Sequence, residues 1–325
     1  MDQVTPQVRP AAVVAGLDGS REAHAAAGWA AADALRRGIP LRLVHAIEPE
    51  VTGGYPAPLL THSTITESLR KHARHLLSTC AAQLTAEHPG LQIDEVPLDG
   101  SPVAVLIAES RDAVLTVVGS HGSGQLSQAI FGSVAARLAA HGHGAVVVVH
   151  PLPGPDALAT GGPVIVGVDG SAQSAAVLGL AFEEADLRGV PLVAIHTWND
   201  KPLEHALGSY PLSVNATAID TEELRLLAEE ISGFQQKYPA VTVHPLVLHG
   251  RPARTLLHYA AGGGHSPDQD GPGLGPAQLL VVGSRGHGGF VGLLLGSTSQ
   301  ALVAHAGCPV AIVRDPVSHR ATLTG

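Results

Sequence analysis

The sequence of 325 residues is poor in lysine, cysteine and aromatic residues. It has three lysines, two cysteines and one methionine, and aromatic residues make up 3% of it. Acidic residues outnumber Lys plus Arg by 28 to 19, so no broad basic surface is available to neutralise a nucleic-acid backbone. The charge balance therefore argues against nucleic acid as a partner.

Long apolar runs are also missing. The start of the chain, MDQVTPQVRPAAVVAG, holds no basic segment followed by a long apolar one, and no later apolar run approaches a membrane-spanning length. We therefore expect a soluble, cytoplasmic protein with no membrane partner. Cys80 and Cys308 share no metal or redox spacing, and we expect both as reduced, packed thiols.

An internal repeat organises the chain. Residues 13–45 match residues 164–196 at a constant offset of 151, which pairs Asp18 with Asp169. The length and the 45% of hydrophobic residues suit two domains, each with its own core. We predict domains at 1–150 and 164–325, with the glycine- and proline-rich segment 151–163 as their linker.

The offset between the two halves grows along the chain. It is 150 for the pairs Pro89 with Pro239 and Gly100 with Gly250, and it is 164 where GSHG in the first half meets GSRG in the second. Roughly fourteen extra residues must therefore lie in the second half. Residues 262–276, GGGHSPDQDGPGLGP, have almost nothing to bury and are predicted to be this insertion, as a surface loop.

Short apolar runs alternate with longer alanine- and leucine-rich stretches. The runs at 13–14, 41–44, 115–118 and 145–149 lack strict alternation, as strands covered on both faces do. The stretches Glu22–Arg37 and Glu67–Leu84 are predicted helices. Alternating strands and helices predict a parallel sheet with right-handed crossovers, whose ligands lie beyond the carboxyl ends of the strands.

A glycine motif follows an equivalent strand in each half. Gly119, Gly122, Gly132 and Ser133 in GSHGSGQLSQAIFGSV have the same spacing as four residues of the second half. A glycine-rich turn that leads into a helix start offers backbone N–H groups to an anion, so each motif is interpreted as a phosphate cradle, with the Ser133 hydroxyl as a further donor. Duplication of a purely structural turn would give the same pattern. The second copy is Gly283, Gly286, Gly296 and Ser297.

The first strand of each half ends in an acidic turn, GLDGS or GVDGS. A carboxylate at the C-terminal end of a strand lies at the mouth of the sheet, where Asp18 or Asp169 can accept a hydrogen bond from a ribose hydroxyl or an exocyclic amine. The alternative is an ordinary turn aspartate before a helix cap. Neither half has a GxGxxG after this strand, and the chain has no GxxxxGK[ST]. Without a P-loop lysine the sequence favours nucleotide binding over turnover.

These features resemble the universal stress protein family, in particular its tandem two-domain actinobacterial members of the ATP-binding branch. That branch carries G-x2-G-x9-G-[S/T] and an acidic residue after the first strand, and both halves fit. The resemblance implies two tandem Rossmann-like α/β domains, related to the adenine nucleotide alpha hydrolases, each with a five-stranded parallel sheet flanked by helices. It also implies that the halves pair through their last strands as an internal pseudo-dimer, with a homodimer left open.

The resemblance further implies one ATP site in each half. Asp18 and Asp169 would contact the adenosine, with Gly16 and Gly167 on the same wall. Ala46 and Thr197 would meet the adenine through backbone atoms. The remaining residues would wrap the ribose and phosphates: Gly119, Ser120, His121, Gly122, Ser123, Gly124, Gln125, Gly132, Ser133 and Val134 in the first half, and Gly283, Ser284, Arg285, Gly286, His287, Gly288, Gly289, Gly296, Ser297 and Thr298 in the second.

The two predicted sites differ at the phosphate end. Arg285 stands where the first half has His121. An arginine beside phosphates strengthens binding at any ordinary pH, whereas a histidine does so mainly when protonated, unless both side chains merely face solvent. The affinities of the two sites need not be equal.

The nineteen histidines do not predict a metal site of the protein's own. His141 and His143 form an HGH pair, but no cysteine or carboxylate cluster joins them at ligand spacing. A divalent ion such as Mg²⁺ would instead be held by the phosphates of the nucleotide.

The sequence leaves three functions open. The first is an ATP-binding stress protein without catalytic residues, whose nucleotide occupancy changes its shape or its binding of an unidentified regulatory protein and so influences growth or survival. The second is a slow ATPase or phosphotransferase, which would need a general base or a positioned cation near the γ-phosphate. The third is a structural interaction module that binds no nucleotide.

Overall fold

The chain forms two compact units, Met1–Val146 and Val147–Gly325. The computed structural model describes residues 11–48, 62–122, 132–150, 161–198, 216–263, 275–286 and 295–314. Most of the predicted linker and most of the predicted insertion lie outside these ranges. The division falls a few residues before the predicted boundary at residue 150, inside a strand, and the predicted boundaries stay predictions.

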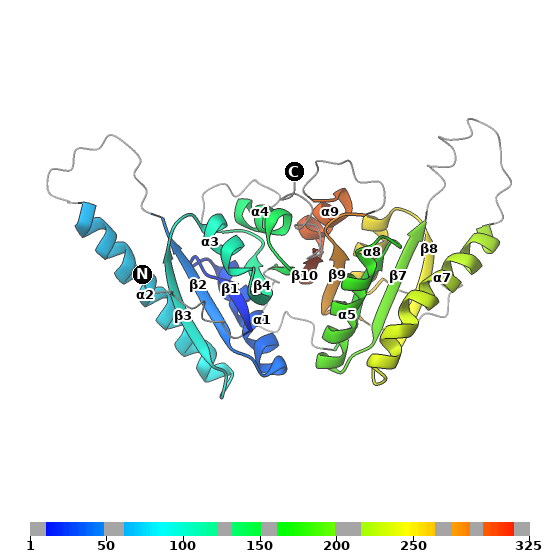
Figure 1. Cartoon of the computed structure of the whole chain (residues 1–325), viewed down its shortest axis with the longest axis horizontal. Helices are drawn as coiled ribbons and strands as arrows, with labels where there is room; N and C mark the ends of the chain where they lie inside the picture. Colours follow the sequence, from blue (N-terminus) through cyan, green and yellow to red (C-terminus); the bar gives the residue numbers. More distant parts are fainter. Residues whose placement is uncertain are drawn as a thin grey trace, which may run out of the picture. The chain divides into compact units, whose positions relative to one another are not determined.

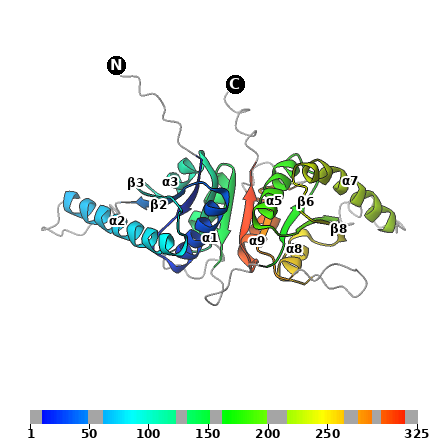
Figure 2. The ribbon, with the colours of Figure 1, turned by 90° about the horizontal axis from the view of Figure 1, so that it is seen from below.

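The first unit alternates strands and helices (Figure 1). Its strands follow the order β3-β2-β1-β4-β5 in the sheet. Helices α1 and α2 cover one face, and α3 and α4 pack together on the other; Figure 2 shows α1 and α2 in front of the strands. The elements are β1 (Ala12–Gly16), α1 (Arg21–Arg37), β2 (Leu41–Ile47), α2 (His62–Glu87), β3 (Ile93–Asp99), α3 (Pro102–Glu109), β4 (Ala113–Gly119), α4 (Ser133–His141) and β5 (Ala145–Val149).

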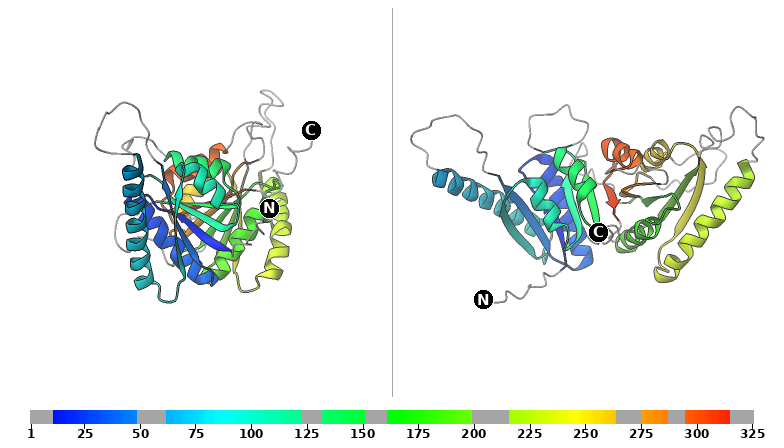
Figure 3. Two further views of the ribbon diagram at one scale, coloured as in Figure 1. Left: turned by 60° about the vertical axis from the view of Figure 1, so that its left-hand side comes forward. Right: turned by 45° about the horizontal axis from the view of Figure 1, so that its top comes forward.

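The second unit repeats this plan. Its strands follow the order β10-β9-β6-β7-β8, and α7 lies along β8 as α2 lies along β3, which the two views of Figure 3 show. Its elements are β6 (Val164–Val168), α5 (Ser174–Arg188), β7 (Leu192–Trp198), α7 (Ala216–Lys237), β8 (Val243–His249), α8 (Pro252–Ala260), β9 (Leu279–Gly283), α9 (Ser297–His305) and β10 (Val310–Val313).

Parallel pairing runs through both units, as predicted. The pairs β1–β2, β1–β4 and β2–β3 are parallel in the first unit, and β6–β7, β6–β9, β7–β8 and β9–β10 are parallel in the second. All five residues of β5 are buried, which explains why its sequence, AVVVV, does not alternate. The edge strand β3 alternates exposed and half-buried residues only from Glu95 to Asp99, and it tolerates Pro97 because one of its sides needs no ladder partner.

Helix α1 begins at a capping residue. The Ser20 side chain accepts a hydrogen bond from Ala23 N at 3.1 Å, and Gly38 ends the helix in the left-handed conformation at φ 65°. The helix therefore starts one residue before the predicted Glu22. Its counterpart α5 starts later, at Ser174, after a turn that Ser174 N closes onto Ser171 O at 2.9 Å.

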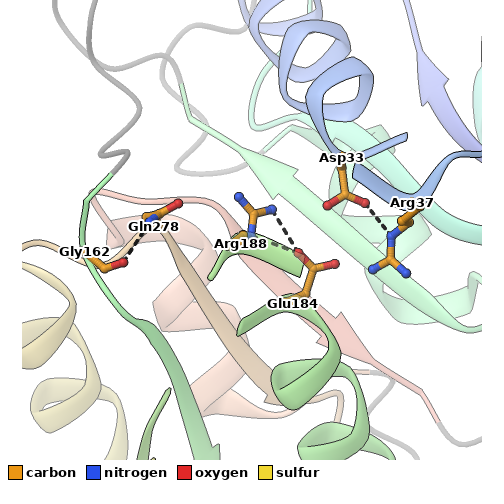
Figure 4. Close-up of polar contacts among 6 residues, drawn as sticks. All are labelled: Asp33, Arg37, Gly162, Glu184, Arg188 and Gln278. Atoms are coloured by element: carbon orange, nitrogen blue, oxygen red, sulfur yellow. Dashed lines mark hydrogen bonds and ion pairs between the residues drawn. The ribbon is translucent and has the colours of Figure 1, made fainter. Parts of the chain in front are cut away.

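A buried ion pair recurs at equivalent positions of α1 and α5 (Figure 4). Asp33 and Arg37 are 2.7 Å apart with side-chain exposures of 0% and 5%, and Glu184 and Arg188 are 2.9 Å apart with exposures of 0% and 4%. Charges so deeply buried are costly unless they are paired, so each arginine offsets the cost of burying the carboxylate beside it.

Both cysteines are buried free thiols, as predicted. Burial raises the pKa of the Cys80 thiol to about 11 and that of Cys308 to about 12, so both are uncharged at neutral pH. Within the described ranges, no helix has both the length and the apolar character needed to cross a membrane.

Candidate functional site

The acidic turn has the same geometry in both units. Asp18 follows β1, and its Oδ1 accepts a hydrogen bond from Ser20 N at 2.9 Å. Asp169 follows β6 and accepts from Ser171 N at 3.0 Å. The intervening Gly19 and Gly170 have φ angles of 84° and 69°, a conformation that favours glycine. Each turn therefore fixes its carboxylate at the C-terminal mouth of the sheet.

Each aspartate meets the glycine motif of its own unit. A Cβ atom added to Gly122 would lie 2.7 Å from Asp18 Oδ2, and one added to Gly286 would lie 2.8 Å from Asp169 Oδ2. The turn after the first strand and the loop after the fourth strand are thus in direct contact. The structure brings together the two features that the sequence singled out separately.

The other two glycines of the first motif also lie in tight places. A Cβ on Gly119 would be 2.7 Å from the backbone carbon of Glu22, and one on Gly132 would be 2.8 Å from Ser120 O. Gly132 N also donates to Ser120 O at 2.9 Å. Tight packing therefore favours glycine at these positions whether or not a ligand binds. This is the structural alternative that the sequence left open.

The second motif is looser. A Cβ on Gly283 would lie 3.1 Å from Gln173 Oε1, and one on Gly296 would lie 3.4 Å from Ser284 O. The hydrogen bond from Gly296 N to Ser284 O remains, at 2.8 Å. The two loops thus share one design but differ in how tightly it is packed.

Each motif ends at a helix N-terminus, as predicted. Helix α4 begins at Ser133 after the N-cap Gly132, and α9 begins at Ser297 after the N-cap Gly296. Both N-caps are glycines and make no side-chain hydrogen bond, so neither N-cap side chain occupies the first N–H groups of its helix. Together with the helix dipole, such N–H groups favour an anion, and Val134 and Thr298 stand second in these helices.

The residues after the fourth strand differ between the units. Ser120 is 1% exposed, and its Oγ is 3.1 Å from Nδ1 of His121. The equivalent Ser284 is also 1% exposed, and its Oγ has no hydrogen-bond partner among the described residues. The replacement of His121 by Arg285 has thus removed a local partner.

A second arginine accompanies Arg285. In the register of β9 with β10, Val313 pairs with Gly283, and Ser284 N donates to Val313 O at 2.9 Å, so Arg314 follows at the same edge. Burial lowers the pKa of Arg314, and the positive charge of Arg285 adds to that effect. Sequence reasoning missed Arg314, which becomes noticeable only through this register.

Two histidines that the sequence did not single out anchor the acidic turns. His45 Nδ1 lies 2.7 Å from Leu17 O, and His196 Nδ1 lies 2.9 Å from Val168 O. Each ring therefore joins the second strand of its unit to the residue before the aspartate. The signal available in the sequence was their equivalence in the repeat.

The residues of the predicted adenosine wall lie beside these histidines and at the sheet. Ala46 and Thr197 directly follow the anchoring histidines in β2 and β7. A Cβ on Gly16 would lie 3.0 Å from Leu106 Cδ1, and one on Gly167 would lie 2.8 Å from Leu256 Cδ1. These two glycines admit α3 and α8 to the sheet, and their place on an adenosine wall stays a prediction.

Six predicted site residues lie outside the described residues: Ser123, Gly124, Gln125, His287, Gly288 and Gly289. Among the residues that the structure describes, no group of three or more His, Cys, Asp or Glu side chains is arranged to hold a metal ion.

Comparison with known proteins places the chain in a family. The family model for the Universal stress protein family matches residues 11–150, 162–266 and 275–314. Universal stress protein Rv2623 of Mycobacterium tuberculosis H37Rv is 36% identical over 315 residues, which cover 94% of this chain and 97% of the relative. Universal stress protein Rv1996 of the same strain is 36% identical over 326 residues, with 94% and 95% covered. The chain belongs to the universal stress protein family.

Solved structures support the same fold. A universal stress protein from Archaeoglobus fulgidus DSM 4304 superposes with a TM-score of 0.66 at 19% identity, covering 93% of this chain and 98% of that one. This likeness concerns the fold, and it agrees with two Rossmann-like α/β units in tandem.

Proposed function

We propose that this universal stress protein binds ATP at one site in each unit and that nucleotide occupancy controls its shape or its binding of a regulatory protein in the cytoplasm. The observation that carries the proposal is the contact between the acidic turn and the glycine loop, at Asp18 and Gly122 and again at Asp169 and Gly286. A carboxylate for the ribose or adenine and a loop that leads to a helix N-terminus then occupy one mouth of each sheet.

The residues fit the adenine nucleotide that the resemblance implies. Gly122 approaches Asp18 so closely that only a residue without a side chain fits there, and the N-cap of α4, Gly132, has no side chain to cap the helix, which suits phosphate oxygens. Asp18 would hold the adenosine and Ser133 the phosphate end, with Asp169 and Ser297 in the same roles in the second unit. Mg²⁺ would be held by the phosphates.

We propose that the protein binds ATP without hydrolysing it efficiently. A phosphoryl transferase needs cations and a base positioned around the γ-phosphate, and the sequence lacks the P-loop lysine that commonly supplies part of this machinery. The association of the two units through their last strands, and any association of two chains, stay predictions.

The first test is the ligand that accompanies the purified protein. We expect adenine nucleotide in the supernatant after denaturation, and we expect stripped protein to bind ATP on titration. Absence of adenine nucleotide together with no measurable affinity at millimolar ATP would contradict the proposal. Sustained phosphate release that Gly132→Val and Gly296→Val both abolish would favour the slow ATPase instead.

A further inference from the structure

The long helices α2 and α7 differ on the stripe that faces their sheets. Leu77 of α2 and Leu227 of α7 are equivalent at the offset of 150, and both are buried. Around Leu77, helix α2 places Ala73 and Cys80, which are also buried. At these two positions α7 has glutamates, Glu223 and Glu230.

The first of these glutamates contacts the histidine that anchors the second acidic turn. His196 Nε2 lies 3.4 Å from Glu223 Oε2, and the two side chains are 17% and 33% exposed. His196 Nδ1 lies 2.9 Å from Val168 O. The ring thus touches the backbone next to Asp169 on one side and a carboxylate on the other.

These two contacts together favour a proton beyond the one on a neutral ring. The carbonyl of Val168 only accepts hydrogen bonds, so Nδ1 must carry a proton to bond with it. In a neutral ring Nε2 would then present a lone pair to the Glu223 carboxylate, and the two would repel each other. The 3.4 Å contact becomes attractive when Nε2, or the Glu223 carboxyl group, carries a further proton.

The surroundings of His196 are acidic. Burial raises the pKa of Glu230, the His196 ring opposes that rise, and the Asp169 carboxylate adds to it. Glu230 Oε1 lies 3.8 Å from the position of a Cβ on Gly170. Glu223 therefore contacts the His196 imidazole, and Glu230 interacts electrostatically with both His196 and Asp169 beside the second acidic turn.

The neighbouring strand places an apolar residue opposite His196. In β8 the residue in register with His196 is Val247. The next titratable side chain on β8, His249, packs edge-on against Trp198 with ring centroids 4.6 Å apart, and Asp220 of α7 accepts the Trp198 Nε1–H at 2.7 Å.

The first unit lacks this arrangement. His45 makes the same Nδ1 contact, at 2.7 Å from Leu17 O, but α2 offers Ala73 and Cys80 in place of the two glutamates. Burial raises the pKa of Cys80 to about 11, so its thiol is uncharged. The His45 ring therefore meets no carboxylate from these positions.

We propose that His196 and Glu223 form a proton-binding site that couples nucleotide affinity of the second unit to pH. The coupling rests on the proposed function, whereas the proton site itself does not. The polyphosphate of ATP is repelled by three carboxylates at the mouth of the sheet, and one bound proton removes one of these negative charges. ATP binding and proton binding therefore favour each other in the second unit.

The proton site is tested in the nucleotide-free protein. The imidazole carbon-bound protons of His196, assigned with His196→Gln, are followed by NMR from pH 5 to 9 in the parent protein and in Glu223→Gln. We expect His196 to take up its proton at a higher pH in the parent. Glu229→Gln, on the same helix and paired with Arg225 instead, is the matched control. An unchanged titration of His196 in Glu223→Gln would overturn the proton site.

The coupling is tested by calorimetric titration with ATP at pH 6.0 and pH 8.5. The Asp18→Ala background restricts binding to the second unit, and Glu223→Gln with Glu230→Gln removes the two carboxylates of α7. Because the γ-phosphate titrates in the same pH range, the quantity compared is the ratio of affinities between variants. We expect the gain in affinity on acidification to be about five- to tenfold larger with the glutamates present.

The outcomes separate the two proposals. An equal pH dependence with and without the glutamates would overturn the coupling. No ATP binding by the parent at either pH would contradict the proposed function and the coupling with it, and the NMR titration would still decide the proton site.

Discussion

Gly132 and Gly296 occupy the same position in their units but have different surroundings. An added Cβ would lie 2.8 Å from the Ser120 carbonyl oxygen at Gly132 and 3.4 Å from the Ser284 carbonyl oxygen at Gly296. The first distance forces a backbone shift, whereas the second is an ordinary van der Waals contact. This third glycine of the motif is therefore sterically strict in the first unit and permissive in the second.

This difference predicts unequal effects of one substitution. We expect Gly132→Ala to lower the free energy of unfolding by about 1–3 kcal/mol through overpacking against backbone. Gly296→Ala should change it by less than about 0.5 kcal/mol, because its φ of −66° suits alanine and the nearest atoms lie at van der Waals distance. Chemical denaturation of both variants checks this. Equal losses in the free energy of unfolding for the two variants would mean that the tight packing at Gly132 adds no cost of its own.

Residue identity predicted the acidic turns and the glycine motifs because both rely on short-range rules of turn geometry. It did not predict the anchoring role of His45 and His196, since their partners, Leu17 O and Val168 O, are backbone atoms 28 positions away. The backbone oxygen of an apolar residue leaves no mark in the sequence.

At the scale of elements, helix and strand positions followed from apolar patterning. The predicted stretches Glu22–Arg37 and Glu67–Leu84 lie within α1 and α2, and α2 extends past both ends of its prediction. The late start of α5 at Ser174 was not foreseen, because the sequence DGS is the same in both halves and the difference lies in the turn that follows.

The buried ion pairs of α1 and α5 give a prediction for these helices. Arg37→Ala would leave the Asp33 carboxylate, which is 0% exposed, without the guanidinium 2.7 Å away. We expect a loss of about 3–5 kcal/mol in the free energy of unfolding. The matched control is Arg74→Ala, because Arg74 is 62% exposed and lies 3.6 Å from Glu67, and its loss should stay below about 1 kcal/mol. Similar losses in both variants would show that burial does not set the cost.

At the scale of the whole molecule, duplication explains both the likeness and the differences of the units. The parallel strand orders, the acidic turns and the two helix starts repeat, and all were visible as internal similarity. The glutamates of α7 were not visible as a feature, because a charged residue on a long helix is usually solvated. Only the packing of Leu227 against the sheet shows that Glu223 lies on the inner stripe.

The central claim is that each unit holds one ATP through its own acidic turn, and the number of ATP molecules bound per chain tests it most directly. Calorimetric titration of stripped protein should give two in the parent, one in Asp18→Ala, one in Asp169→Ala and none in the double variant, with the circular dichroism spectrum unchanged. Full binding of ATP by the folded double variant would contradict the account.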